Sequence, residues 1–175
     1  IIGLSTAITC MLLAVLYWKD ERSYDSFHTN SPYRILTNVV NKEGITVTTG
    51  GTGQVQGPAF KAAVPEVKNY VRVMGGDIYS DISAEEKSLH LQPLFVDNSF
   101  FDVFTFELLD GNKKDALGDV SYAVLTERKK KKFFNSTDVV GKRLQIDADP
   151  SFENLGKPLI VSAIVKDPPA NSSLQ

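Results

Sequence analysis

The chain has little of the side-chain chemistry from which active sites are built. Its 175 residues include one cysteine, Cys10, and two histidines, His28 and His90, which lie far apart in the sequence. This inventory leaves no cysteine pair for a disulfide and no cysteine or histidine pair at the spacing of a metal site. The Gly-x-Ser-x-Gly motif of serine hydrolases is also missing. We therefore expect no catalytic residue, no cofactor-binding residue and no metal ligand, and we interpret the chain as non-enzymatic.

An excess of charge of either sign is missing too. There are 19 basic and 21 acidic residues, which gives a net charge of -2, and nothing in this balance points to a nucleic-acid partner. The 42% of apolar residues and 23% of charged residues are ordinary for a globular protein. The length suits one domain of about 150 residues after an N-terminal segment.

One glycine-rich stretch and one lysine run invite functional interpretations. Gly50-Gly51-Thr52-Gly53 resembles part of a phosphate-binding loop, but the required Lys-Ser/Thr pair is replaced by Gln54-Val55. A flexible connection is the better interpretation. The run Lys129 to Lys132 predicts a solvated helix face rather than a patch that binds lipid headgroups.

The one long apolar run is Ile1–Trp18, which precedes the first charge at Lys19. A helix of that length is roughly 27 Å long, close to the ~30 Å of a bilayer's hydrocarbon core. A signal peptide would need a basic start and a small-residue cleavage site, and a buried core helix is usually shorter. Tyr17 and Trp18 lie where an interfacial aromatic belt would place them. We expect a transmembrane helix, continued by residues 19–28, in a fragment of a longer protein.

The remainder predicts an α+β domain with a mixed or antiparallel sheet and short helices. Residues Phe100, Phe101 and Phe104 have helical spacing and are expected in the core rather than around a ligand. Thr126 is expected to cap a helix. A tight turn is expected at 75–77 and a polar loop at 147–156. Strands are expected at 33–40, 45–49, 67–74, 78–82, 88–96, 121–125, 144–146 and 159–165, and helices at 58–64, 99–104 and 127–134.

Several stretches in this order resemble a known family. They are IIGLSTAITCMLLAVLYWKDERSYDSFH, PEVKNYVRV, LFVDNSFFDVFTFELLDG, YAVLTERKKKKFFN, DVVGKRL and VSAIVKDPPANSSL. Together they resemble the N-terminal part of the ABC transporter permeases of Bacteroidetes-type bacteria, which carry a MacB-like periplasmic core domain and FtsX-like membrane segments. The helix after the Val-Leu-Thr strand is richer in lysine than in the family, and Asn135 stands where the family has glycine. Asparagine adopts the same left-handed conformation, so the expected fold is unchanged.

The resemblance implies a domain organisation and a set of partners. Residues 1–28 would be the transmembrane helix with its periplasmic extension, and residues 29–175 a MacB-like periplasmic core domain that is incomplete at its C-terminus. The permease would lie in the bacterial inner membrane, with lipid around residues 1–18 and the chain after about residue 19 in the periplasm. It would work with a separate cytoplasmic ABC ATPase subunit, as a permease dimer or pseudo-dimer.

The implied function is to couple ATPase-driven movement of the membrane helices to export or extraction of a substrate. An extracytoplasmic sensor or ligand-binding domain of a membrane signalling protein is the alternative, since one anchor and a mixed domain fit it equally well. A membrane-anchored enzyme is a third possibility, which the lack of an acid-base or nucleophile set disfavours.

Overall fold

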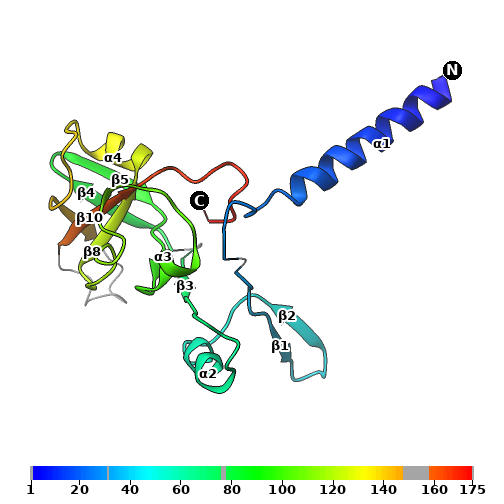
Figure 1. The fold of residues 1–175 in the computed structure, drawn as a ribbon, viewed down its shortest axis with the longest axis horizontal. Helices are drawn as coiled ribbons and strands as arrows, with labels where there is room; N and C mark the ends of the chain where they lie inside the picture. Colours follow the sequence, from blue (N-terminus) through cyan, green and yellow to red (C-terminus); the bar gives the residue numbers. More distant parts are fainter. Residues whose placement is uncertain (1, 31, 76–77, 148–157, 175) are drawn as a thin grey trace.

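A single long helix stands apart from a mixed sheet in the computed structural model of the chain (Figure 1). The structure describes residues 2–30, 32–75, 78–147 and 158–174. The turn expected at 75–77 and the loop expected at 147–156 lie almost entirely outside these ranges. The α+β class, with an N-terminal helix, short helices and a largely antiparallel sheet, is confirmed.

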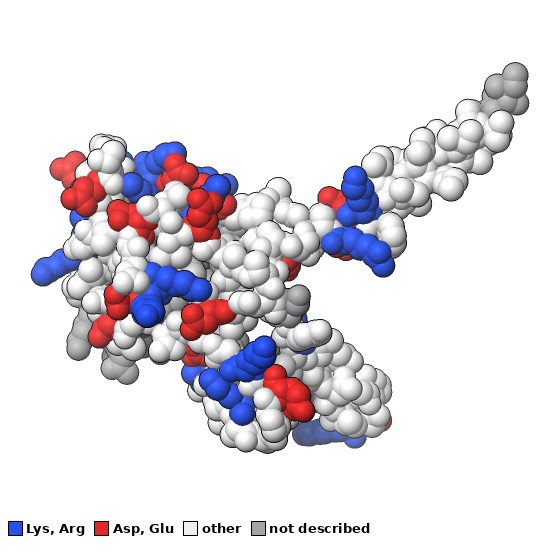
Figure 2. Space-filling model, viewed as in Figure 1, with Lys and Arg blue, Asp and Glu red and all other residues white. Residues whose placement is uncertain are grey.

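Helix α1 (Ile2–Glu21) confirms the helix expected at the N-terminus. Its surface is free of charged side chains except near its C-terminal end (Figure 2). Within the described ranges, however, no helix combines the length and the apolar character needed to cross a membrane. Lys19, Asp20 and Glu21 fall inside α1 and lower its mean hydropathy. The transmembrane segment expected at Ile1–Trp18 is therefore not confirmed, and its first residue lies outside the described residues.

The helix does not continue to His28, so that expectation is wrong. After Glu21 the chain forms a series of turns. The hydroxyl groups of Ser23 and Ser26 donate to the backbone carbonyls three residues before them, at 2.7 and 2.8 Å. Such bonds compete with helical pairing, and Asp25 has a left-handed backbone with φ of 54°. These hydrogen bonds and the left-handed backbone of Asp25 keep the helix from continuing.

The main sheet has β10 at its centre. This strand runs parallel to β8 on one side, and on the other it pairs antiparallel with β9 along its first half and with β7 along its second half. Strands β4 and β5 extend the sheet beyond β9. The strands are β4 (Ser80–Ala84), β5 (Lys87–Leu91), β7 (Leu108–Gly111), β8 (Tyr122–Thr126), β9 (Arg143–Asp147) and β10 (Leu159–Val165).

Two groups of apolar side chains form the core. The first includes Phe133 and Phe134 at the end of helix α4 (Glu127–Phe133), which pack against inward-facing residues of the sheet. The second contains Phe100 and Phe101 of helix α3 (Phe100–Val103), with Phe104 packed against them. The expectation that these phenylalanines belong to the core is confirmed.

Helix α4 begins as expected and carries the lysine run. Thr126 Oγ1 accepts a hydrogen bond from the backbone N–H of Lys129 at 3.3 Å. Lys131 and Lys132 are exposed, as a solvated face requires, whereas Lys129 and Lys130 are half-buried. The lysine run therefore lies only partly on a solvated face.

A smaller, peripheral part lies beside the sheet (Figure 1). It contains helix α2 (Gln56–Ala63) and the antiparallel hairpin of β1 (Thr37–Val40) and β2 (Thr46–Thr49), which lie within the strands expected at 33–40 and 45–49. Strand β3 (Val73–Met74) pairs with β6 (Phe95–Val96) in a separate two-stranded sheet. The strands expected at 67–74 and 88–96 are therefore too long. Pro93 cannot donate to a ladder, and it separates β5 from β6.

Candidate functional site

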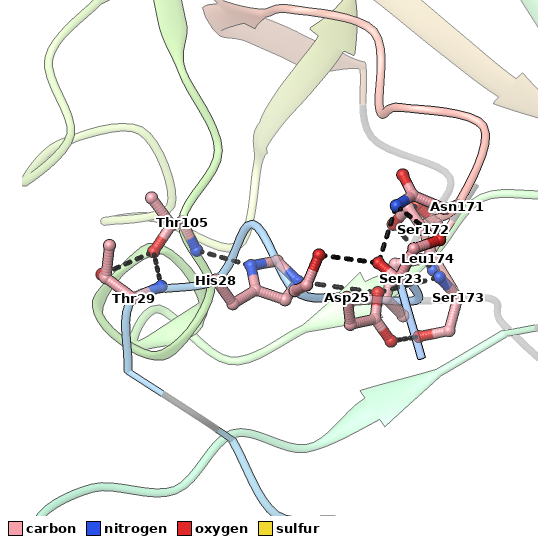
Figure 3. A network of polar contacts seen from close by, with 10 residues as sticks. Ser23, Asp25, His28, Thr29, Thr105, Asn171, Ser172, Ser173 and Leu174 are labelled. Carbon is pink, nitrogen blue, oxygen red and sulfur yellow. Dashed lines mark hydrogen bonds and ion pairs between the residues drawn. The ribbon is translucent and has the colours of Figure 1, made fainter. Parts of the chain in front are cut away.

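The segment that joins α1 to the sheet domain is the best-organised polar site of the described chain. We call residues 22–30 the junction segment. It contacts two stretches that are distant in sequence: residues 102–106, at the end of α3 and just after it, and residues 171–173 near the C-terminus (Figure 3). Both stretches belong to the sheet domain, so the junction segment is attached to that domain at two places.

The C-terminal contact is built around Asp25. Its backbone N–H donates to the carbonyl of Asn171 at 2.9 Å. Its carboxylate accepts two hydrogen bonds from Ser173, one from the backbone N–H at 2.9 Å and one from the hydroxyl at 2.5 Å. The Asn171 side chain donates in return to the carbonyl of Ser23 at 2.6 Å. Hydrogen bonds to a charged acceptor are stronger than neutral ones, so Asp25 is the main fixed point here.

The second contact is built around Thr105. Its hydroxyl accepts from the backbone N–H of Thr29 at 3.1 Å and lies 3.0 Å from the Thr29 hydroxyl. The Asn30 side chain donates to the carbonyl of Asp102 at 2.8 Å. In addition, the backbone N–H of Thr105 donates to Nδ1 of His28 at 3.0 Å. An amide N–H only donates, so this geometry assigns the lone pair to Nδ1 and the proton of a neutral ring to Nε2.

His28 is the buried centre of the junction. Its side chain has no exposed surface, and the rings of Phe27, Phe104 and Phe106 surround it with centroids 4.0 to 5.3 Å away. Nε2 has no hydrogen-bond partner in the described structure and lies 3.8 Å from Oδ1 of Asp25. Burial lowers the pKa of His28, and the nearby Asp25 carboxylate offsets part of that effect.

This arrangement is suited to attachment rather than to catalysis. It offers an imidazole and a carboxylate, but the carboxylate is occupied by Ser173 and the imidazole is enclosed. Across the ranges that the structure covers, no three His, Cys, Asp or Glu side chains form a group that could hold a metal ion. The chemistry available is a set of specific hydrogen bonds that hold one segment against two others.

His90 lies on β5, within the strand expected at 88–96, and the glycine stretch forms the expected connection. His90 is exposed on β5, where Nδ1 lies 2.7 Å from Oδ1 of Asp81 and the ring stacks on Tyr79. Residues 50–53 form a connection between β2 and α2. Sequence reasoning missed the role of His28. The signals available were the aromatic neighbour Phe27 and the carboxylate of Asp25 three residues earlier.

The whole chain, residues 1–175, matches a family described as the MacB-like periplasmic core domain. The chain belongs to this family. Among solved structures, it is similar to a crystallised domain of a protein described as a permease from Porphyromonas gingivalis, with 25% identity and a TM-score of 0.66 over 80% of this chain. The chain spans 58% of the length of that domain.

Two further structures share more distant similarity with the MacB-like domain. The first is the periplasmic region of MacB from Actinobacillus actinomycetemcomitans, with 20% identity and a TM-score of 0.44 over 62% of this chain and 50% of that one. The second is the extracellular domain of the ABC-type transporter YknZ from Gram-positive bacteria, with 18% identity and a TM-score of 0.43 over 55% of this chain and 49% of that one. No curated protein sequence gives a significant match. The family places this MacB-like domain among the extracytoplasmic domains of ABC transporter permease-type proteins.

Proposed function

We propose that this MacB-like domain belongs to a permease subunit that works with a separate cytoplasmic ABC ATPase. In this proposal, ATP hydrolysis moves the membrane helices, and the domain converts that movement into export or extraction of a substrate. The permease acts as a dimer or pseudo-dimer, so that two such domains move relative to each other. The observation that carries the proposal is the doubly attached junction segment.

The junction is the path by which movement of α1 reaches the sheet. Helix α1 has 20 residues, so it is about 30 Å long, and it stands away from the domain (Figure 1). The hydrogen bonds of Asp25 and Asn171 hold the start of the junction segment, and those of Thr29 and Asn30 hold its end. A segment fixed at both ends transmits displacement with less loss than a flexible linker, since few of its torsions are free to absorb the motion.

We also propose that α1 holds the domain at the inner membrane, with lipid around residues 1–18 and the later residues in the periplasm. Large apolar side chains are exposed along the helix, from Leu4 to Trp18. The polar side chain of Thr9 is satisfied inside the helix, because its hydroxyl donates to the carbonyl of Ser5 at 2.9 Å. At the domain end, the Arg22 guanidinium lies 4.1 Å from the centre of the Trp18 ring, a pairing suited to an interfacial belt.

Cys10 gives a direct test of the lipid proposal, because it is the one cysteine of the chain and is exposed on α1. A polarity-sensitive fluorophore on Cys10 is expected to shift its emission to shorter wavelength, and to become inaccessible to an aqueous quencher, when the chain is reconstituted into vesicles. The matched control carries the fluorophore on Val120→Cys in a Cys10→Ser background, since Val120 is 94% exposed on the sheet domain. Equal quenching at the two positions would contradict the proposal.

The coupling proposal is tested in the assembled permease with its ATPase. Spin labels on Val120→Cys in a Cys10→Ser background are expected to report a distance between two domains that changes when ATP binds. The double variant Asn171→Ala, Ser173→Ala removes side-chain hydrogen bonds of the junction. It is expected to hydrolyse ATP normally while the distance change is lost. A distance change of the same size in this variant would refute the role of the junction.

The alternative of a signalling sensor makes a different prediction about the complete gene. The permease proposal expects further apolar spans of about 20 residues and a neighbouring gene for an ATPase with a Walker loop. A single additional span followed by a kinase or cyclase domain would favour the sensor.

A further inference from the structure

We infer that the junction is a pH-sensitive latch, closed while His28 is neutral and released when His28 takes up a proton. The inference concerns regulation of the junction, and its biological consequence rests on the function proposed above. Its physical basis is the position of a fully enclosed imidazole between the two contacts that hold the junction segment (Figure 3).

The closed junction requires the neutral ring. Nδ1 accepts from the backbone N–H of Thr105 at 3.0 Å, so it must keep its lone pair. A protonated ring carries hydrogens on both nitrogens, and the hydrogen on Nδ1 would point at the N–H of Thr105. Protonation therefore replaces a hydrogen bond with two opposed donors, and it leaves the partly buried amide of Thr105 without its acceptor.

The surroundings offer little compensation for the added charge. Phe27, Phe104 and Phe106 enclose the ring without offering a strong hydrogen-bond acceptor. Asp25 is the nearest carboxylate, with Oδ1 3.8 Å from Nε2, and Ser173 holds it in place with two hydrogen bonds. To form a direct hydrogen bond with the imidazolium, Asp25 would have to move closer and weaken its bonds to Ser173. That movement loosens the C-terminal contact as well.

Other charged groups near this site face solvent and have their own partners. Asp102 lies in α3, where its carboxylate is 66% exposed and 3.8 Å from Lys113, and Glu107 lies after α3, where its carboxylate is 62% exposed and paired with Lys166. The C-terminal stretch 171–173 contributes Asn171, Ser172 and Ser173, which do not titrate. Solvent screens the two exposed pairs, so Asp25 is the charge that bears on His28.

The direction of the pH effect follows from the preference for the neutral ring. The closed junction is at full strength above about pH 6.5, the ordinary pKa of histidine. As the pH falls below that value, the open state binds more protons than the closed state. The ratio of closed to open junctions therefore falls about tenfold per pH unit until the lowered pKa of His28 is reached.

The experiment is an NMR titration of the full 175-residue chain, labelled with ¹⁵N in lipid nanodiscs, from pH 7.5 to 5.0. Imidazole nitrogen shifts should show the proton of His28 on Nε2 and a titration midpoint below 6.5. Over the same pH range, the amides of Thr105 and Ser173 should lose at least tenfold in protection against hydrogen exchange, after correction for intrinsic rates. The amide of Val161 in the core strand β10 should keep its protection.

Two asparagine variants make the test specific. In His28→Asn, the side-chain oxygen accepts from Thr105 and does not titrate, so protection should stay constant across the pH range. His90→Asn removes the other, exposed histidine and should keep the wild-type pH response. The inference would be overturned if protection of the Thr105 and Ser173 amides did not change with pH in the wild type. It would also be overturned if His28→Asn lost protection at low pH as the wild type does.

If His28→Asn fails to fold, the wild-type titration still decides, because a His28 midpoint at or above 6.5 refutes the latch. None of these measurements involves transport. A latch that titrates in a chain whose assembled permease shows no ATP-dependent movement would leave this inference standing and refute the proposed function.

Discussion

Replacing Asn171 with alanine is expected to weaken the junction without unfolding the domain. The Asn171 side chain donates to the Ser23 carbonyl at 2.6 Å and more weakly to the Ser23 hydroxyl at 3.2 Å, and Asn171 is not part of either core group. A hydrogen bond of this kind contributes roughly 0.5–1.5 kcal/mol net. The equilibrium for local opening of the junction should therefore rise about 2- to 13-fold, since 1.4 kcal/mol corresponds to a factor of ten.

Native-state hydrogen exchange measures this local change. The amides of Asp25 and Ser173, which donate across the contact, should exchange faster in Asn171→Ala by that factor. The midpoint of urea unfolding should shift little, because the core remains packed. Asn135→Ala is the matched control, since the Asn135 side chain accepts a hydrogen bond from the Lys87 ammonium on the exposed surface, away from the junction.

Two results would refute this reasoning. Unchanged exchange at Asp25 and Ser173 would mean that the Asn171 side chain does not hold the contact. A loss of protection that extends into β10, together with a large drop in the free energy of unfolding, would mean that the junction and the sheet unfold as one unit. In that case the junction would not act as a separate element.

Further expectations concern the stability of the domain, measured by urea unfolding. Gly111→Ala should lower the free energy of unfolding by more than about 2 kcal/mol, because Gly111 has φ of +89° and the added Cβ would lie 2.6 Å from a carbonyl oxygen of β10. Gly44→Ala should lower it by only about 1 kcal/mol, because Gly44 has φ of +80° but nothing lies near the added Cβ. Phe133→Ala should cost about 3–5 kcal/mol, because Phe133 is fully buried. Hydrogen bonding to Arg72 lowers the pKa of Asp97, so the stability from this pair is present above about pH 4 and is lost as the pH falls through the lowered pKa. Asp97→Asn should cost about 1 kcal/mol at pH 7 and weaken the acid dependence, and an equally steep dependence in that variant would contradict this.

Elements with a strong local signal are predictable from the sequence. Strand β10 has the predicted bounds because its run of β-branched residues is buried in the centre of the sheet. Helix α4 begins where Thr126 can cap it, and its cap forms within four residues of chain. In these cases the decisive interactions are local, or depend on the apolar character of consecutive residues.

Elements that depend on distant pairing are not predictable in the same way. Strand β7 exists because its residues pair with β10, and its end at Gly111 is set by the close approach of that strand. Strands β3 and β6 have two residues each, which is too short for any alternation to be read. The resemblance to a family indicated the kind of fold, but the register of these pairs is fixed only when the strands meet.

The junction is harder still to predict from the sequence, because its central residue, His28, looks ordinary there. The segment around His28 contains five charged residues between Lys19 and Asp25, which favours an exposed extension of α1. The turns after Glu21 reverse that expectation, because they place the ring beside Phe104 and Phe106, whose positions depend on α3 and β7. Burial of His28 thus depends on three separate parts of the chain, and so does the latch. If any one of them moves, the imidazole gains access to water and its pKa returns toward 6.5. The pKa of His28 is therefore a reporter of whether α1 and the sheet domain are joined.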